Sequence, residues 1–423
     1  MDDAGASLQA EMSAMGRAAT AAAQALRLAE PAARTRAIAA MAAAVRAAAP
    51  EILAANARDV VAAQAAGLTA PMVDRLLLDA ARLEGLAQAL ETVAAIPDPV
   101  GVEIGRWTRP NGLDIARVRT PIGVIGIIYE SRPNVTADAA ALCVRAGNAV
   151  ILRGGSECLA TNLAIHAALV EGLREAALPE ACVQIVRTAD RAAVGAILAG
   201  LDGAVDLIIP RGGKSLVARV QAEARAPVLG HLEGLNHVFL HASADPQKAI
   251  AIAVNAKLRR VSVCGAAETL LVDAAAAERL LPPVAKALAE AGCELRGDAA
   301  ARAIVPMAAA TEADWTTEYL APVISIAVVE GVAGAAAHIA TYGSAHTDAI
   351  VAEDAAAAEE FVARVDSAIV LINASTQFAD GGEFGFGAEI GIATDRLHAR
   401  GPVGAEQLTT YKYVVRGTGQ TRP

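Results

Sequence analysis

The chain of 423 residues is 55% hydrophobic, 19% charged and only 3% aromatic, with a formal net charge of −10. This length favours two or three domains over a single core, and the apolar content excludes intrinsic disorder. The acidic balance argues against a general nucleic-acid binder, because such a protein needs a basic surface to neutralise phosphates.

The N-terminus, MDDAGASLQAEM, has acids where a signal peptide carries basic residues, and it lacks the apolar core of such a peptide. The chain also contains no run of about 18 apolar, uncharged residues with a strong preference for lipid. The sequence therefore predicts a cytoplasmic protein that does not span or bind a membrane.

Residues 5–95 are alanine-rich, and Leu, Ile, Val and Met recur among them at spacings of three and four, which predicts helices. The segment IPDPVG (96–101) interrupts this pattern with two prolines. Asn111–Gly112 then lies between two extended segments, which is a strong hairpin signal. This hairpin is either an arm that pairs with another subunit or a local surface ribbon.

From residue 122 onward, short β-rich runs alternate with helical segments. Such alternation predicts βαβ units and a parallel sheet that is covered on both faces. The first series contains IGVIGIIY, NAVILR, VQIVR, AVDLII and HVFLH, with helices near 136–146, 156–176, 190–199, 213–225 and 246–257. A second series follows Cys264 and contains TLLVD, PVISIAVV, DAIVA and SAIVLIN, with helices near 277–291 and 331–341. TTYKYVVRG is expected to form the last strand.

The five cysteines are scattered without CxxC spacing, and the seven histidines form no pair such as HxxxH. This pattern fits a reducing compartment. It argues against a disulfide framework, a zinc site and metal catalysis.

Cys264, in KLRRVSVCGAAET, differs in its setting from the other cysteines. Small residues follow it, and Lys257, Arg259 and Arg260 precede it, so nearby positive charge could favour a thiolate. Its place between the two α/β series would put it in an interdomain cleft, where ligand sites are common. Two interpretations stay open: a nucleophile, or a small buried hydrophobic residue of the kind expected for Cys143, Cys158, Cys182 and Cys293.

Two glycine pairs follow predicted strands, in RGGSE (153–157) and PRGGKS (210–215). The second is not a P-loop, because Ile208 stands where the first glycine is required, and the chain has no GxGxxG. Exposed N–H groups at a helix start beside Lys214 suit a phosphate or pyrophosphate, although a plain strand-to-helix turn has the same pattern. Both pairs lie where ligands gather in open parallel sheets.

Four blocks resemble the gamma-glutamyl phosphate reductase family, which belongs to the aldehyde dehydrogenase superfamily. They are PIGVIGIIYESRPNVTADAAALCVRAGNAVILRGGSE (121–157), DLIIPRGGKSL (206–216), NAKLRRVSVCGAAETLLVD (255–273) and DGGEFGFGAEIGIATDRLHARGPVGAEQLTTYK (380–412). The resemblance implies an aldehyde-dehydrogenase-like α/β fold in three parts. These are a Rossmann-type cofactor domain (1–102 and 122–258), a second α/β catalytic domain (259–375), and a β-hairpin oligomerisation arm with the C-terminal tail (103–121 and 376–423).

The resemblance also implies a reaction, the NADPH-dependent reduction of L-glutamyl 5-phosphate to L-glutamate 5-semialdehyde with release of phosphate, in proline biosynthesis. A cysteine thiolate attacks the acyl phosphate, phosphate leaves, and hydride from the nicotinamide reduces the thioester. A homodimer or homotetramer is expected, and a glutamate 5-kinase is a possible partner.

The resemblance assigns roles residue by residue. Cys264 is the nucleophile, and Asn134, or Arg132 beside it, stabilises the oxyanion; Asn134 is preferred because it donates without adding a full charge. Glu318 resembles the glutamate that holds the nicotinamide ribose, although an exposed acid without that role also fits. The remaining candidates are Arg153, Ser156, Glu157, Gly212, Gly213 and Lys214 for the cofactor, and Arg132, Lys257, Arg259, Arg260 and Arg400 for the substrate.

The chain departs from the family pattern at two places. Many members have QRPS before the nucleophile and asparagine after it, whereas this chain has RRVS and Gly265, which is expected to leave the pocket more open. The LELGG block with which hydrolytic relatives activate water is missing, and Glu233 nearby is not assigned as a base.

Two alternative functions stay open. The first is the oxidation or CoA-acylation of another aldehyde, and the second is a non-enzymatic scaffold whose thiol is incidental. The missing water-activating block argues against hydrolytic oxidation, and the family-specific block near the C-terminus argues against a scaffold.

Overall fold

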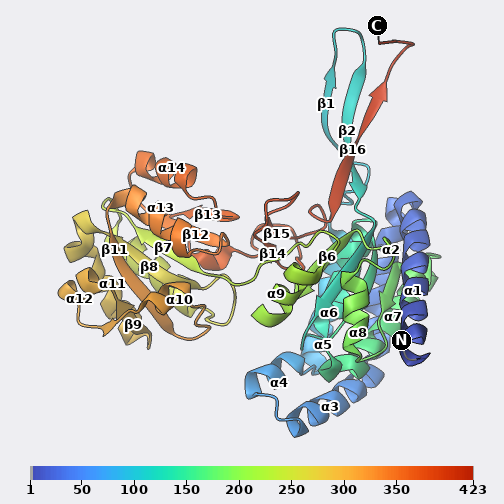
Figure 1. Cartoon of the computed structure of the whole chain (residues 1–423), viewed down its shortest axis with the longest axis horizontal. Helices are drawn as coiled ribbons and strands as arrows, with labels where there is room; N and C mark the ends of the chain where they lie inside the picture. The colour runs from blue at the N-terminus through green and yellow to red at the C-terminus, as the bar shows by residue number, and fades with distance from the viewer. Residues whose placement is uncertain (1–2, 423) are drawn as a thin grey trace. The chain divides into compact units, whose positions relative to one another are not determined.

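The computed structural model describes residues 3–422, which divide into two compact units. Unit 1 comprises the chain up to Gly230, together with Gly385–Gly391 and the residues from Val403 onward. Unit 2 comprises His231–Phe384 and Ile392–Pro402. Each unit has its own parallel sheet with helices packed on it, so the predicted α/β class is confirmed (Figure 1).

Helices open unit 1, as the sequence predicts. They are α1 (Asp3–Leu28), α2 (Pro31–Ala47), α3 (Ala49–Ala65), α4 (Ala70–Leu76) and α5 (Ala80–Ala95). Buried Arg34 of α2 pairs with Asp98 at 2.9 Å and donates to the carbonyls of Leu26 and Ala29, which ties α2 to the end of α1. No single described helix is long and apolar enough to cross a membrane; α2 and α3 reach that length and composition only together, with a bend of 68° between them.

The sheet of unit 1 has four parallel strands in the order β5-β4-β3-β6. The strands are β3 (Val124–Tyr129), β4 (Ala149–Arg153), β5 (Val183–Ile185) and β6 (Leu207–Arg211), and the helices are α6 (Asn134–Arg145), α7 (Leu159–Glu175), α8 (Arg191–Leu198) and α9 (Lys214–Glu223). β3 and β4 are almost wholly buried, as continuous apolar runs require. The strand order reverses between β3 and β6, and open α/β sheets bind ligands at the carboxyl ends of such neighbours.

An antiparallel sheet in the order β1-β2-β16 completes unit 1. It contains β1 (Glu103–Thr108), β2 (Asp114–Pro121) and β16 (Thr409–Arg416). The predicted hairpin is confirmed, and Gly112 in its turn has φ of 85°, which favours glycine. The predicted last strand is also confirmed, and β16 pairs with β2 along its whole length. The contact of this arm with another subunit stays a prediction.

Unit 2 is built on a seven-stranded parallel sheet in the order β10-β9-β11-β8-β7-β12-β13. Val238, Leu270 and Ile326 face one core cluster and Phe239 and Leu271 face another, because successive residues of a strand point to opposite sides. The strands are β7 (Asn236–Leu240), β8 (Ala267–Asp273), β9 (Glu294–Gly297), β10 (Ala308–Ala309), β11 (Val323–Val329), β12 (Thr347–Val351) and β13 (Ile369–Ile372). The helices are α10 (Pro246–Leu258), α11 (Ala277–Glu290), α12 (Ala299–Ile304), α13 (Gly331–Tyr342) and α14 (Ala355–Arg364).

Several short elements were not expected from the sequence. β9 and β10 extend the sheet of unit 2, α12 lies between them in the chain, and β14 (Ile392–Ala393) pairs with β15 (Gly401–Pro402). Glu294 and Arg296 interrupt the apolar pattern of β9, which hides it from a periodicity search. Single-turn helices lie at Ser156–Cys158, Glu180–Cys182, Ala274–Ala276, Glu312–Thr316 and Thr376–Phe378.

Candidate active site

Cys264 lies in the loop that joins α10 to β8. Its side chain is half-buried, whereas the other four cysteines are buried. Burial raises the pKa of the Cys158, Cys182 and Cys293 thiols to about 12, 12 and 11, and it also raises the pKa of Cys143. Because the thiolate is the nucleophilic form, these four buried thiols are poor nucleophiles and Cys264 is the accessible one.

Buried Asn236, the first residue of β7, holds the backbone of the Cys264 loop. Its Nδ2 donates to the carbonyls of Cys264 (2.6 Å) and Ala266 (2.9 Å), and its Oδ1 accepts the N–H of Thr347 (3.1 Å). The amide thus joins the starts of β7, β8 and β12, which are neighbours in the sheet. Because these bonds reach backbone atoms, they fix the loop without engaging the sulfur.

Gly234 lies so close to the same loop that a side chain cannot fit there. A Cβ at this position would lie 2.0 Å from the carbonyl oxygen of Cys264 and 2.9 Å from its Cα. Gly234→Ala is therefore expected to displace the loop and to lower any turnover that depends on Cys264 about 10²-fold, a loss typical of a group moved by about 1 Å.

Gly85→Ala provides the matched control, because a Cβ on this exposed glycine of α5 would meet nothing within 4 Å. Its turnover should equal that of the wild type, and its helix should gain about 0.5–1 kcal/mol. Steady-state rates of the two variants, measured side by side, test the account. Equal rates would show that the Cys264 loop tolerates a side chain at position 234.

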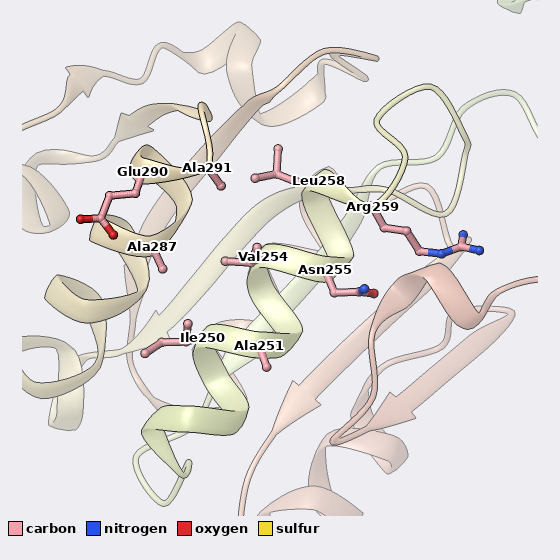
Figure 2. A pocket seen from close by; sticks show the side chains of 9 residues that line it. All are labelled: Ile250, Ala251, Val254, Asn255, Leu258, Arg259, Ala287, Glu290 and Ala291. Carbon is pink, nitrogen blue, oxygen red and sulfur yellow. The ribbon is translucent and has the colours of Figure 1, made fainter.

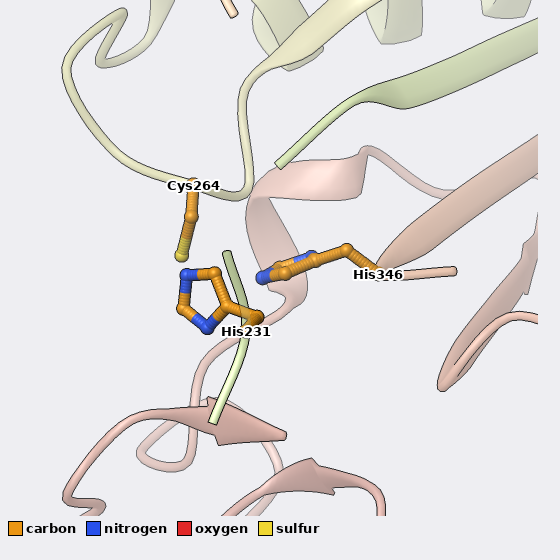
Figure 3. Close-up of side chains that lie close together, drawn as sticks. All are labelled: His231, Cys264 and His346. Atoms are coloured by element: carbon orange, nitrogen blue, oxygen red, sulfur yellow. The ribbon is translucent and has the colours of Figure 1, made fainter. Parts of the chain in front are cut away.

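Two histidines from distant segments lie beside Cys264 (Figure 3). One nitrogen of His231, one nitrogen of His346 and the sulfur of Cys264 all lie within 4.8 Å of one another. The two rings meet edge to face with their centroids 4.9 Å apart. The three residues precede three different strands: His231 comes shortly before β7, Cys264 before β8 and His346 before β12. Because β8, β7 and β12 are neighbours in the parallel sheet, all three residues lie at the amino-terminal ends of adjacent strands.

The His231 ring is held in one orientation by its other nitrogen. Nδ1 lies 2.7 Å from the carbonyl oxygen of Ile392, which can only accept, so Nδ1 carries the proton. Nε2 of the neutral ring then keeps its lone pair, and this nitrogen points toward the sulfur in Figure 3. A thiol beside such a nitrogen has the arrangement of a nucleophile and its base.

Lys257, which the sequence places among the substrate residues, is fully buried in α10. Its Nζ lies 2.5 Å from Oε2 of Glu268 and 5.6 Å from the centre of the Tyr319 ring. Burial raises the pKa of Glu268 to about 7, although Lys257 lowers it. The charge of Lys257 is directed at an interior carboxylate, and this position argues against contact with a substrate phosphate.

The other basic candidates of unit 2 lie nearer to solvent. Arg259 and Arg260 are exposed just after α10. Arg400 is half-buried and donates both to the carboxylate of Asp366 (2.7 Å) and to its carbonyl (2.8 Å). An anion that binds Arg400 must therefore share it with Asp366.

Glu318 and Gly265 also flank the Cys264 loop. Glu318 is half-buried, and its Oε1 accepts the N–H of Gly234 at 3.0 Å, which steadies the segment under the loop. A Cβ on Gly265 would lie only 3.2 Å from the carbonyl oxygen of Thr376 and 3.7 Å from Cβ of Ala379. A side chain at position 265 would therefore be crowded by the segment around Thr376 and Ala379, and the expected opening of the pocket stays a prediction.

The glycine pair after β6, Gly212–Gly213, forms a turn whose backbone N–H donates to an anionic oxygen. The N–H of Gly213, at the start of α9, donates to Oε2 of Glu130 at 2.9 Å. A Cβ on Gly212 would lie 2.6 Å from the same oxygen, so only glycine leaves this position open. Exposed Lys214 follows at the first residue of α9. A phosphate group that binds this turn would therefore have to displace the Glu130 carboxylate from the N–H of Gly213.

The second glycine turn, after β4, carries the other cofactor candidates. The Arg153 guanidinium donates to two backbone carbonyls at 2.9 and 3.2 Å. Oε1 of Glu157 accepts the N–H and the hydroxyl of Ser131 at 2.6 and 2.7 Å, which shapes the loop after β3. Ser156, which lies between Arg153 and Glu157 in the chain, is exposed.

Arg132 and Asn134 line a small cavity of unit 1 together with Asp138, Arg211 and Glu389. The amide of Asn134 donates to Oδ2 of Asp138 at 2.9 Å. Burial raises the pKa of Asp138 to about 6, although this hydrogen bond lowers it. Asn134 is exposed, but it must exchange its carboxylate partner before it can donate to an oxyanion.

A separate apolar groove runs between α10 and α11 of unit 2 (Figure 2). Its lining residues are Ile250, Ala251, Val254, Asn255, Leu258, Arg259, Ala287, Glu290 and Ala291. This lining includes neither Cys264 nor either of the histidines beside it. A groove without converging reactive groups offers no acyl chemistry, so the Cys264 loop remains the candidate active site.

The chain is similar to known proteins over nearly its whole length. A family model described as "Aldehyde dehydrogenase family" matches residues 3–320. The chain is 76% identical to the gamma-glutamyl phosphate reductase of Caulobacter vibrioides over 97% of this chain and 100% of that protein. It is 64% identical to that of Hyphomonas neptunium over 99% and 98%. The solved gamma-glutamyl phosphate reductase of Thermotoga maritima is 44% identical and matches with a TM-score of 0.95 over 98% of this chain and 100% of that one.

Proposed function

The chain belongs to the gamma-glutamyl phosphate reductase family within the aldehyde dehydrogenases, and we propose that it reduces L-glutamyl 5-phosphate to L-glutamate 5-semialdehyde with NADPH and releases phosphate. The observation that carries the chemistry is the accessible thiol of Cys264 beside the acceptor nitrogen of His231. As a step of proline biosynthesis, the reaction fits a cytoplasmic enzyme.

Cys264 is the proposed nucleophile, and His231 is the proposed base. His231 Nε2 takes the thiol proton, and the sulfur bonds to the acyl carbon as the bond from that carbon to the phosphate oxygen breaks. Asn236 and Gly234 hold the loop while the bond forms, because they fix the backbone of Cys264. Asn134 or Arg132 is the proposed donor to the oxyanion.

The residues of unit 1 fit a dinucleotide. Gly212, Gly213 and Lys214 would hold its pyrophosphate, and the N–H of Gly213 would then exchange the Glu130 carboxylate for a phosphate oxygen. Arg153, Ser156 and Glu157 would meet its adenosine ribose. Glu318, which belongs to unit 2, is the proposed partner of the nicotinamide ribose. When bound, NADPH supplies the hydride that converts the acyl group to the aldehyde.

Three further assignments complete the proposal. Arg259, Arg260 and Arg400 attract the phosphate and carboxylate of the substrate. The arm of β1, β2 and β16, with exposed Trp107 and Tyr413, forms the contact of a homodimer or homotetramer. A glutamate 5-kinase supplies the unstable acyl phosphate, and direct transfer between the two enzymes would protect it from water.

The reverse reaction provides the test of function. The full chain, given glutamate 5-semialdehyde in equilibrium with its cyclic form, should reduce more than one equivalent of NADP⁺ per active site only when inorganic phosphate is present, because phosphate is the acyl acceptor that frees Cys264 for another turnover. The rate is followed by the absorbance of NADPH. Reduction that needs CoA in place of phosphate, or that proceeds with simple aldehydes and no acceptor, would overturn the proposal.

His231→Ala tests the base. The variant should lose about 10²- to 10⁴-fold in kcat/KM, the usual contribution of general base catalysis, and its Cys264 should react more slowly with iodoacetamide at pH 7. His241→Gln is the matched control, because His241 follows the carboxyl-terminal end of β7, whereas His231 precedes the amino-terminal end of the same strand. Unchanged alkylation in His231→Ala would remove this histidine from the activation of the thiol.

A further inference from the structure

The cluster of His231, Cys264 and His346 at the amino-terminal ends of β7, β8 and β12 contains one more side chain than acyl transfer requires. The reaction needs a thiol and one base, whereas a second imidazole, that of His346, also reaches the group. All three donor atoms lie within 4.8 Å of one another, and Figure 3 shows both rings turned toward the sulfur. The presence of His346 in the cluster therefore suggests that the three side chains also bind a ligand.

His346 carries an interior nitrogen that the protein leaves unsatisfied. The residue is 0% exposed, and its Nδ1 lies 2.9 Å from the hydroxyl of Thr347. Its Nε2 is buried and has no hydrogen-bond partner among the described residues. A buried polar atom without a partner destabilises the folded state. Nε2 of His346 points toward His231 and Cys264 in Figure 3, so a ligand bound by the three side chains would give this nitrogen a partner.

The donor set selects the kind of ligand. Two imidazole nitrogens and one thiolate suit a borderline-soft transition metal, and the cluster contains no carboxylate to favour Mg²⁺ or Ca²⁺. The other nitrogen of His231 donates to the carbonyl of Ile392, which is the outer hydrogen bond that a metal-binding histidine usually makes. We propose that His231, Cys264 and His346 bind one Zn²⁺ ion, with a fourth position open to water.

The geometry needs only a small adjustment. With Zn–N of about 2.0–2.1 Å and Zn–S of about 2.3 Å, a tetrahedral ion holds its ligand atoms about 3.3–3.6 Å apart. From the upper limit of 4.8 Å, each pair of ligand atoms has to approach by at most about 1.2–1.5 Å. The thiol releases its proton to solvent when the Zn–S bond forms. Local sequence spacing hides this site, since its ligands precede three different strands.

Zinc at this position inhibits the enzyme, because it takes the sulfur and the base together. This consequence rests on the proposed function, whereas metal binding does not. One equivalent of Zn²⁺ should abolish phosphate-dependent NADP⁺ reduction, and EDTA should restore it. Zn²⁺ at this site should also protect Cys264 from iodoacetamide.

Cobalt spectroscopy of the full chain tests the site without turnover. One equivalent of Co²⁺ should give thiolate-to-cobalt charge-transfer absorption and the strong visible bands of a four-coordinate ion, and Zn²⁺ should displace it. Cys264→Ala should lose the charge-transfer band, and His346→Gln should bind Zn²⁺ at least about 10²-fold more weakly in competition with a chromophoric chelator. Cys293→Ala, which removes a buried thiol of the same unit, should keep both properties.

The outcomes separate the site from the function. A weak six-coordinate cobalt spectrum, or equal Zn²⁺ affinity in the wild type, Cys264→Ala and His346→Gln, would overturn the site. If His346→Gln does not fold by circular dichroism, Cys264→Ala decides alone, because Cys264 lies in a half-exposed loop. A normal cobalt spectrum without any reductase activity would keep the site and reject the function.

Discussion

Cys264→Ala is expected to lower phosphate-dependent NADP⁺ reduction by at least about 10³-fold, because the sulfur forms the bond to the acyl group in every turnover. The fold should persist, since the hydrogen bonds from Asn236 reach backbone atoms of the loop and not the sulfur. NADPH should still bind, because the proposed pyrophosphate turn belongs to unit 1 and Cys264 belongs to unit 2. Steady-state rates and a fluorescence titration with NADPH measure the two properties separately.

Cys293→Ala is the matched control for this variant. Cys293 is a buried thiol of unit 2 that packs in the main core cluster. Its removal should cost about 1 kcal/mol of stability and leave the rate near that of the wild type. A rate that survives Cys264→Ala, or that falls equally in both variants, would exclude Cys264 as the nucleophile.

Lys257→Met is expected to lower the free energy of unfolding by about 3–5 kcal/mol, because it leaves the Glu268 carboxylate without its partner in the interior. Methionine has a similar volume, so the loss reports the missing charge and not a cavity. Lys286→Met is the control, since this side chain of α11 is 74% exposed and should change stability by less than about 0.5 kcal/mol. Urea unfolding of both variants provides the measurement.

The pH dependence gives this prediction a second readout. Burial raises the pKa of Glu268 to about 7 even beside Lys257, so this carboxyl binds a proton more tightly in the folded chain than in the unfolded one. A carboxyl group whose pKa is higher in the folded than in the unfolded chain stabilises the fold at low pH. This stabilisation is lost as the pH rises from the pKa of the unfolded chain to that of the folded chain. Without Lys257 the folded pKa rises further, so the deficit of Lys257→Met should shrink as pH falls from 8 to 5.

A double variant completes the test of the buried pair. Lys257→Met with Glu268→Gln removes both charges, so it should recover part of the stability and lose most of the pH dependence. If Lys257→Met instead unfolds like the wild type but raises KM for phosphate, Lys257 would be a substrate residue, as the sequence predicts.

The fold was largely predictable because several of its strands are short, mostly apolar runs. VIGIIY and AETLLVD are buried over their whole lengths in β3 and β8, and such runs separated by helices have few other solutions than a parallel sheet. The sequence did not show that β16 would join β2, because the pairing depends on segments at opposite ends of the chain. It also missed β9, because Glu294 and Arg296 interrupt the apolar pattern of this strand.

The candidate site was only partly predictable, because its residues come from segments that are distant in the sequence. Cys264 was identified from its neighbours and from family blocks, but His231 and His346 have no local spacing that links them to it. A signal was present: each of the three residues precedes a predicted strand, HVFLH, TLLVD or DAIVA. Only the strand order β8-β7-β12 makes their starts adjacent, and no local pattern encodes that order. The sequence shows the charge of Lys257 near Cys264 but not the buried Glu268 that pairs with it, so the burial of this lysine could not be predicted.

The most direct test of the claim that Cys264 carries the acyl group is mass spectrometry of the enzyme trapped in turnover. Glutamate 5-semialdehyde and NADP⁺ without phosphate should leave the thioester with no acceptor. The wild type should then gain the mass of one glutamyl group on the peptide that contains Cys264, lose it when phosphate is added, and gain nothing as Cys264→Ala. A glutamyl adduct on another residue, or phosphate-dependent turnover without any adduct, would contradict the account.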